Sequence, residues 1–312
     1  MSIDNSSAHD RTVLVFGATG QQGGAVARAL RDLGWSVRAL VRTPDSDNAK
    51  ALAARGMQLA AGDFSDIASI ERAMTGAYGV FSVQPSSGQG AVYGVSDADE
   101  IRYGKSIADI AADTGVQHLV YTSVNAAGPK KTGMGHFDSK AEIERHIRGL
   151  DITSTIIRPA GFMELLMLPG MGLDKGYFMS FVRPDQRAQI IAVQDIGTIV
   201  ASIFADAKRF AGRIIEIAGD EITGSSLGES LSRAAGRPII YRRFPDNLLE
   251  EDRFLGRLAA LFDDGRLAGN ADIDALISEF GRLTSFDAWL AGPGKPLLET
   301  ALQADDRPIA LR

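Results

Sequence analysis

Short β-rich runs alternate with stretches of helical composition from residue 12 to about residue 158, and this alternation constrains the fold more than any other feature. Strands alternating with helices of this length indicate βαβ units and a parallel sheet with helices on both faces. Runs such as TVLVF at 12–16 and HLVY at 118–121 lack a polar face, as expected of strands buried on both sides. Because crossover connections are right-handed, few topologies remain. The predicted class is therefore α/β, with a doubly wound parallel sheet of the Rossmann type.

The pattern loosens after the sixth β-rich run, which indicates a second, smaller α/β lobe. We expect a disordered leader over 1–10, a Rossmann domain over 11–158, and a lobe over 159–312 that partly returns to the main sheet. A segment rich in methionine, phenylalanine and glycine at 160–180 leaves the carboxyl end of the sixth run. This segment suits either a lid over an apolar substrate or ordinary packing between the lobes.

Composition excludes several kinds of function. The net charge is −6 and no basic cluster is present, which disfavours direct binding to nucleic acid or to an anionic membrane. The chain has no cysteine, and its four histidines do not form metal-binding spacings, so neither thiolate chemistry nor a zinc site is expected. No apolar run reaches transmembrane length, and the N-terminus lacks the order of a signal peptide. We therefore expect a soluble cytoplasmic protein.

Three glycines at a spacing of three, in GATGQQGG, lie directly between the first predicted strand and the first predicted helix. Gly17 would allow a tight turn, Gly20 a close approach of a diphosphate to the backbone, and Gly23 close packing of the helix on the strand. A P-loop is excluded because Gln21 and Gln22 stand where it needs lysine and serine or threonine. The sequence predicts a dinucleotide-binding turn made by Gly17, Thr19, Gly20, Gln21, Gln22 and Gly23.

The end of the second predicted strand, VRALVRTP, discriminates between NAD and NADP. An NAD site usually has a carboxylate here, whereas this chain has Arg42 followed by Thr43. A guanidinium binds a 2′-phosphate through charge-assisted hydrogen bonds, so we predict NADP(H) as the cofactor. The alternative is that Arg42 is a solvated loop charge and that Asp45 or Asp47 folds back onto the ribose.

Two further strand ends extend the predicted cofactor site. Asp63 and Phe64 follow the third strand and suit the adenine, although an aspartate before a helix is equally well explained as an N-cap. Val83 and Gln84 follow the fourth strand, on the side of the nicotinamide ribose.

Three segments together carry a family resemblance: GATGQQGG, HFDSKAEIERHIRGL and IIRPAGFMELL. With them the chain resembles the NmrA-like family, atypical relatives of the short-chain dehydrogenases, over most of residues 12–300. The resemblance implies a Rossmann domain that binds NADP(H), a small α/β lobe and a cleft between them. It extends the predicted cofactor site to Lys140, Pro159 and Phe162.

Short-chain dehydrogenases that turn over substrate use a serine and a Tyr-x-x-x-Lys pair. By resemblance, Ser123 takes the serine position and Lys140 the lysine position, whereas His136 stands at the tyrosine position, as in the NmrA-like family. His136 and Lys140 are four residues apart, so they project from one face of a helix. Lys140 is predicted to hold the nicotinamide ribose, and it can also protonate the substrate if burial or a cationic cofactor lowers its pKa. His136 either serves as an acid or only caps the helix or fills the cleft. Tyr121 shares the strand side of Ser123 and is either a replacement phenol or a packed aromatic residue.

Two functional hypotheses follow. The first is an NADPH-dependent reductase of a small apolar carbonyl, quinone or enone-like compound bound in the cleft between the lobes. The second, favoured by the missing tyrosine, is a non-catalytic NADP(H) sensor that engages a protein partner. An isomerase or lyase with tightly held NADP is a third class that the sequence does little to favour, and a homodimer stays open.

Overall fold

The computed structural model describes residues 11–89 and 94–303, so the leader predicted at 1–10 lies outside the described residues. The chain divides into two compact units and passes between them several times. The first unit consists of Met1–Ser123, Gly135–Arg158 and Val193–Ile215. The second consists of Val124–Met134, Pro159–Ala192 and Glu216–Arg312.

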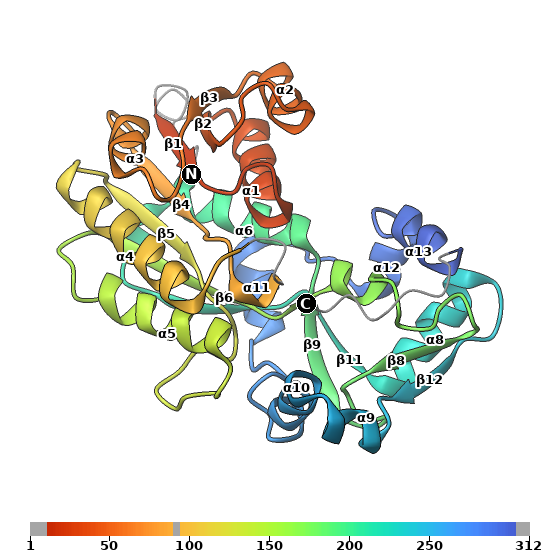
Figure 1. The fold of residues 1–312 in the computed structure, drawn as a ribbon. Helices are drawn as coiled ribbons and strands as arrows, with labels where there is room; N and C mark the ends of the chain where they lie inside the picture. Colours follow the sequence, from red (N-terminus) through yellow and green to blue (C-terminus); the bar gives the residue numbers. More distant parts are fainter. Residues whose placement is uncertain (1–10, 90–93, 304–312) are drawn as a thin grey trace. The chain divides into compact units, whose positions relative to one another are not determined.

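The first unit is built on a seven-stranded sheet with the order β3-β2-β1-β4-β5-β6-β10 (Figure 1). β1 pairs in parallel with β2 and β4, and parallel pairing continues to β3 on one side and through β5 to β6 on the other. This confirms the predicted α/β class and its doubly wound parallel sheet. The strands are β1 (Thr12–Val15), β2 (Ser36–Val41), β3 (Gln58–Ala61), β4 (Gly79–Ser82), β5 (His118–Thr122), β6 (Ser154–Pro159) and β10 (Ile214–Ile217), the last of which contains a unit boundary.

Helices cover both faces of this sheet: α1 and α6 pack together on one face, and α3, α4 and α5 pack on the other (Figure 1). Glycine allows the close approach of α1 and α6, because a Cβ at Gly197 would lie 2.5 Å from the carbonyl oxygen of Ala25. The helices are α1 (Gln21–Asp32), α2 (Asp47–Ala54), α3 (Ile67–Met74), η1 (Ser87–Gln89), α4 (Asp97–Asp113), α5 (Gly135–Ile147), α6 (Val193–Ala205) and α7 (Ala207–Phe210).

The second unit combines two small sheets with several helices. One sheet has the order β11-β9-β7, and the other pairs β12 with β8 in parallel. Its strands are β7 (Gly161–Phe162), β8 (Tyr177–Ser180), β9 (Arg187–Ile191), β11 (Asp220–Thr223) and β12 (Ile240–Arg243). Its helices are η3 (Met163–Met167), α8 (Gly224–Ala235), α9 (Asp246–Glu251), α10 (Arg253–Asp263), α11 (Ile273–Phe280), α12 (Phe286–Ala291) and α13 (Lys295–Leu302).

The methionine-rich segment 160–180 contributes to the core of the second unit. Met163, Met167 and Met171 are buried in one apolar cluster with Phe178 and Trp289. This packing lies inside one unit, so the lid and the packing between the lobes both stay predictions.

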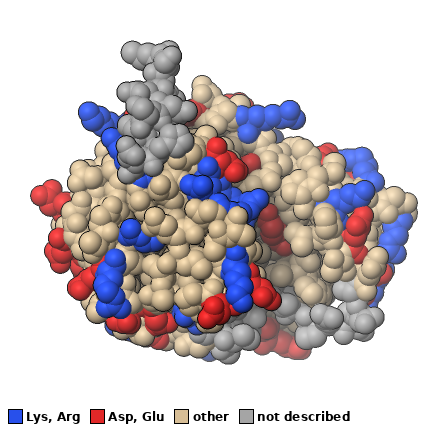
Figure 2. All heavy atoms as spheres, turned by 90° about the horizontal axis from the view of Figure 1, so that it is seen from above, with Lys and Arg blue, Asp and Glu red and all other residues tan. Residues whose placement is uncertain are grey.

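Charges of both signs lie interspersed on the face drawn in Figure 2. The sequence contains 33 Lys and Arg against 39 Asp and Glu, which agrees with this mixed surface. None of the helices that the structure describes is long and apolar enough to cross a membrane.

Candidate functional site

The sheet order reverses between β1 and β4, and the carboxyl ends of these strands form the topological switch point at which doubly wound sheets bind ligands. The glycine turn lies there, between β1 and α1. Gly17 has a positive φ of 61°, and a Cβ on it would lie 2.9 Å from Cγ1 of Val83, which follows β4. A Cβ on Gly23 would collide with the carbonyl oxygen of Gly17. Gly17 and Gly23 therefore have geometric reasons to be glycine.

The start of α1 is suited to an anion. Its N-cap is Gly20, no side chain caps it, and its first turn contains no acidic residue. Thr19, Gly20 and Gln21 are exposed. The backbone N–H groups and the positive end of the helix dipole are therefore available to a phosphate. Gln22 differs, because its side-chain oxygen accepts a hydrogen bond of 2.8 Å from Oγ1 of Thr122 at the end of β5.

The end of β2 separates two arginines that the sequence places close together. Arg38 donates to the carbonyl oxygens of Ala73 (2.6 Å) and Thr75 (2.9 Å), so its guanidinium is engaged within the fold. Arg42 and Thr43 are exposed beyond the strand. Within the described residues no hydrogen bond or ion pair engages Arg42, which makes it the better ligand for a phosphate. Asp45 and Asp47, the alternative ribose ligands, are exposed just before and at the start of α2.

Asp63 does not cap α3, so the capping alternative is wrong. The N-cap is Asp66, whose side chain accepts from the backbone N–H of Ser69. Asp63 instead accepts from the backbone N–H (2.9 Å) and the hydroxyl (2.5 Å) of Ser65, and these bonds, with the charge of Arg42, lower the pKa of its carboxyl. Asp63 therefore stays ionised. Phe64 packs between the rings of Phe16 and Tyr103, at centroid distances of 5.6 and 5.4 Å.

Tyr121 lies in β5 and Ser123 directly follows this strand, and both side chains are buried. Tyr121 is fully buried in the core, and its burial and the charges of Glu100 and Glu144 raise the pKa of its phenol well above the ordinary value. The packed-aromatic interpretation fits this environment. Ser123 is also buried, and no group among the described residues hydrogen-bonds its Oγ. A buried hydroxyl without a partner is costly, so a bound molecule that bonds to Ser123 would satisfy it.

Lys140 takes part in a group that we call the Lys140 cluster, consisting of Ser86, Glu100 and Lys140. Nζ of Lys140 donates to Oε1 of Glu100 and, at 3.4 Å, to Oγ of Ser86. Oγ of Ser86 donates to Oε2 of Glu100 at 2.8 Å. Because Ser86 follows β4 closely along the chain, the cluster lies beyond the carboxyl end of the strand whose extension touches Gly17.

His136 packs against the same segment after β4. A Cβ on Gly88 would lie 2.8 Å from Cγ and Cδ2 of its ring. Burial, and next the charge of Lys140, lower the pKa of His136 to about 4. The imidazole is therefore neutral at pH 7, which supports the space-filling interpretation over that of a charged acid.

Four other predicted residues follow β4 or lie in β6 and β7. Gln84 is buried and donates to Oγ of Ser82 at 2.7 Å, and Val83 lies against Gly17 as described. Pro159 ends β6, and its carbonyl oxygen accepts from the backbone N–H of Asn125. Phe162 is half-buried in β7, where it pairs with Ile191 of β9. Pro159 and Phe162 belong to the second unit.

Sequence reasoning missed Glu100 and Ser86. One signal was available for Glu100, because it shares a helical stripe with Gly104, Ile107 and Ala111 of α4. An acidic residue on such an apolar stripe is seldom buried without a partner. Ser86 carried no comparable signal.

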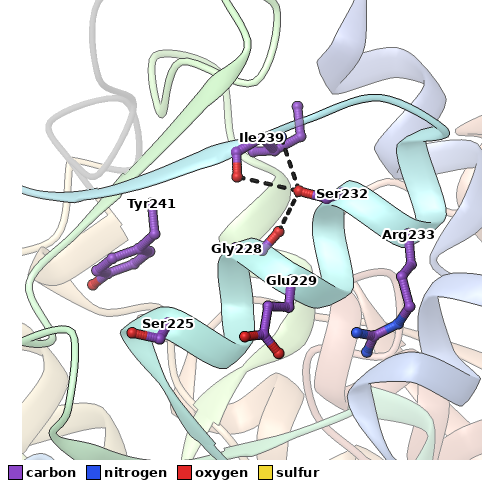
Figure 3. A pocket seen from close by; sticks show the side chains of 7 residues that line it. All are labelled: Ser225, Gly228, Glu229, Ser232, Arg233, Ile239 and Tyr241. Atoms are coloured by element: carbon purple, nitrogen blue, oxygen red, sulfur yellow. Dashed lines mark hydrogen bonds between the residues drawn. The ribbon is translucent and has the colours of Figure 1, made fainter.

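A hollow of about 430 Å³ on the second unit contains none of the predicted site residues (Figure 3). Ser232 on α8 donates to the carbonyl oxygen of Gly228 and accepts from the N–H of Ile239, at 2.7 and 2.8 Å. Arg233 is paired with Asp287. The polar groups of this hollow are thus largely engaged with one another or with neighbouring residues. No group of three or more potential metal ligands occurs in residues 11–89 and 94–303.

The fold and the switch-point turn define a Rossmann-type α/β protein. A family model described as the NmrA-like family matches residues 9–287. The chain belongs to the NmrA-like family, which confirms the resemblance.

Two curated relatives share this family name. An NmrA-like family domain-containing protein of Dictyostelium discoideum is 30% identical over 250 residues, covering 74% of this chain and 80% of that protein. The NmrA-like family domain-containing oxidoreductase FrzB of Cladobotryum sp. is 32% identical over 228 residues, covering 65% of this chain and 67% of FrzB.

Solved structures show the same fold at lower identity. NmrA, a negative transcriptional regulator in complex with NADP, has a TM-score of 0.75 and 22% identity, covering 94% of this chain and 98% of NmrA. An NADPH-dependent quinone oxidoreductase of Escherichia coli has a TM-score of 0.70 and 22% identity, covering 89% of this chain and 98% of that protein.

Proposed function

We propose that this protein binds NADP(H) and reduces a small apolar carbonyl, quinone or enone-like substrate. The observation that carries this proposal is the arrangement at the switch point, where the glycine turn contacts Val83 and the segment after Val83 contacts Lys140. This arrangement puts an anion-binding turn and a half-buried cation along one strand extension. It suits a ligand with a diphosphate at one end and a reactive group at the other.

Each part of the cofactor has suitable residues in the first unit. The N–H groups at the start of α1 would bind the diphosphate, and the missing Cβ atoms of the turn allow its approach. Arg42, with the hydroxyl of Thr43, would bind the 2′-phosphate. The ionised carboxylate of Asp63 would accept from the adenine amino group. Lys140 would hold the nicotinamide ribose.

The reaction needs a donor at the atom of the substrate on which negative charge develops. When bound, the reduced cofactor supplies a hydride. Ser123 would donate a hydrogen bond from its buried Oγ, and the ammonium group of Lys140 would place positive charge at the site and hold a proton on Nζ. His136, neutral at pH 7, would exclude water and support the segment after β4.

The comparisons support a reductase in two ways. FrzB is named an oxidoreductase, and the Escherichia coli protein with the same fold is an NADPH-dependent quinone oxidoreductase. We extend the substrate class of that protein to this chain as part of the proposal.

One observation favours a second function, a non-catalytic NADP(H) sensor that engages a protein partner. The position of the usual tyrosine is occupied by a histidine that is packed against Gly88 and has a pKa of about 4. At pH 7 its imidazole lacks the extra proton that an acid would donate in place of the phenol. NmrA itself, which shares the fold, is a negative transcriptional regulator.

The two functions are separated by one experiment on the full chain. NADPH binding is measured by nicotinamide fluorescence, and NADPH oxidation is then followed over a panel of quinones, enones and aromatic carbonyls. A reductase oxidises NADPH with at least one compound, and Lys140→Ala lowers kcat/KM for this compound by about a hundredfold. Tight binding without turnover across the panel, with an oligomeric or partner state that changes between NADPH and NADP, would instead establish the sensor.

A further inference from the structure

Glu100 is the most deeply buried acidic side chain among the ion pairs of the described residues, with 1% of its side chain exposed. It lies on the core-facing stripe of α4, where ionised carboxylates are rare because burial disfavours their charge. Both of its oxygens have a partner: Oε1 accepts from Lys140 and Oε2 accepts from Ser86. A carboxylate buried in this way needs partners that offset the cost of burying its charge. The two partners of Glu100 indicate what the carboxylate does.

The cation of this pair lies closer to solvent than the acid. The Lys140 side chain is 18% exposed, so the pair connects the interior of the α4–α5 layer with the edge of the candidate site. An ammonium group has three N–H donors, and hydrogen bonds to Glu100 and Ser86 account for two of them. One N–H thus remains for a ligand.

Glu100 also connects Lys140 to the segment after β4. Ser86 bridges Glu100 and Lys140, the next residue Ser87 donates to Asp97 of α4, and Gly88 contacts His136 of α5. The first turns of α4 and α5 therefore hold consecutive residues of one segment. Lysine has a long flexible stem and loses considerable rotamer freedom when it is held in one place. A buried carboxylate with a second partner in the segment can hold it there.

We propose that Glu100 is a positioning residue: it holds Nζ of Lys140 against the segment after β4, so that the remaining N–H faces the nicotinamide ribose. The inference rests on the proposed function, because that function assigns the ribose to Lys140. Glu100 itself touches neither cofactor nor substrate, and it acts through Lys140.

The test is a double-mutant cycle between Glu100→Gln and Lys140→Met, with the dissociation constant of NADPH and kcat/KM as readouts. Glu144→Gln is the matched control, because Glu144 is also a buried glutamate of the α4–α5 layer but pairs with Arg158. We expect Glu100→Gln to weaken NADPH binding by about tenfold and Glu144→Gln to change it by less than about twofold. In the Lys140→Met background, Glu100→Gln should have no further effect.

The outcomes separate the two proposals. If Lys140→Met leaves NADPH binding and turnover unchanged, the assigned role of Lys140 is wrong and the inference is lost with it. If Lys140→Met weakens binding while Glu100→Gln does not, or does so equally in both backgrounds, only the inference is overturned. If Glu100→Gln fails to fold, Ser86→Ala replaces it, because it removes both hydrogen bonds that Ser86 makes in the cluster and keeps the ion pair. The effect of Ser86→Ala must likewise vanish in the Lys140→Met background.

Discussion

Two buried ion pairs lie in the same layer of the first unit. They differ in what the cation contacts besides its carboxylate partner. The carboxylate of Glu144 in α5 accepts hydrogen bonds from Nε and Nη2 of Arg158 in β6, at 2.9 and 2.7 Å. This pair connects a helix to the sheet. The carboxylate of Glu100 in α4 accepts hydrogen bonds from Lys140 of α5 and from Ser86, which belongs to the segment after β4. The charges of both glutamates act on the phenol of Tyr121, so they share one interior. The geometry suggests that the first pair serves the fold and the second serves the site.

The largest effect should come from breaking the pair between Glu144 and Arg158. Glu144→Ala leaves a guanidinium without its partner in a mostly buried place, and we expect the free energy of unfolding to fall by about 3 kcal/mol. Glu142→Ala on the same helix is the control: Glu142 pairs with Lys105 at the surface, so its loss should cost less than about 1 kcal/mol. Urea denaturation measures both. Equal losses would contradict the structural role of Glu144.

Replacing both partners of each pair by neutral side chains separates function from stability. The double variant Glu100→Gln with Lys140→Met should lose about a hundredfold in kcat/KM, because the ribose loses its ligand. Glu144→Gln with Arg158→Met should retain kcat/KM within about twofold, since neither residue reaches the proposed ligand. Both variants should fold, because replacing a whole buried pair is often neutral for stability. A comparable loss of turnover in the two variants would remove the distinction between the pairs.

Arg42 supplies a third kind of cation: it is exposed, its charge acts on Asp63, and it forms no hydrogen bond or ion pair with the described residues. Arg42→Ala should weaken NADPH binding by about tenfold, because a charge-assisted contact to the 2′-phosphate is lost. NADH has no 2′-phosphate, so its affinity serves as the internal control and should stay the same. Loss of affinity for both cofactors would point instead to damage of the glycine turn. An unchanged affinity for NADPH would favour the alternative in which Asp45 or Asp47 binds the ribose.

The smallest effect concerns His136, whose pKa of about 4 results first from burial and second from the charge of Lys140. Removing that charge in the Glu100→Gln, Lys140→Met variant should raise the pKa of His136, while the Glu144→Gln, Arg158→Met variant leaves it in place. NMR titration of the imidazole measures this. The rise should be smaller than the shift that burial causes, because burial is the larger of the two causes.

The same pKa implies a pH dependence of stability. The folded value of about 4 lies below the ordinary value of 6.5, so the unfolded chain binds more protons between these values. The contribution of His136 is therefore complete above pH 6.5 and is lost as the pH falls towards 4. His136→Gln should flatten the slope of unfolding free energy against pH in this window. Burial also lowers the pKa of His118 to about 4, so His118 still contributes to the slope in the His136→Gln variant. The slope that remains in this variant serves as the reference.

Local features of the candidate site were readable from the sequence, whereas distant pairings were not. The alternation of strands and helices predicted the sheet, and the glycine spacing predicted the turn, because both depend on neighbours along the chain. Nothing in the sequence near Arg38 shows that its guanidinium is engaged, since the carbonyl groups that accept from it lie 35 and 37 residues further on. Glu100 lies 40 residues from Lys140, and only the three-dimensional packing of α4 on α5 brings them together.

The N-cap of α3 and the pairing of β9 and β10 could likewise not be predicted from the local sequence. Asp63 and Asp66 are both acidic residues just before α3, and only the backbone geometry distinguishes the cap from the turn. Likewise β9 and β10 are similar apolar runs. β9 joins the sheet of the second unit, and β10 joins the large sheet beside β6, a choice made by long-range pairing.

The close packing of α1 on α6 has a consequence for how the protein is made. Gly197 of α6 lies against Ala25 of α1, and the residues between them include most of the first unit and a long excursion into the second. During synthesis, the face of α1 that packs on α6 stays exposed to solvent until α6 has left the ribosome. A nascent chain halted after residue 158 therefore carries a complete glycine turn on an incomplete layer, and chaperones that recognise exposed apolar helices have their best opportunity at that stage.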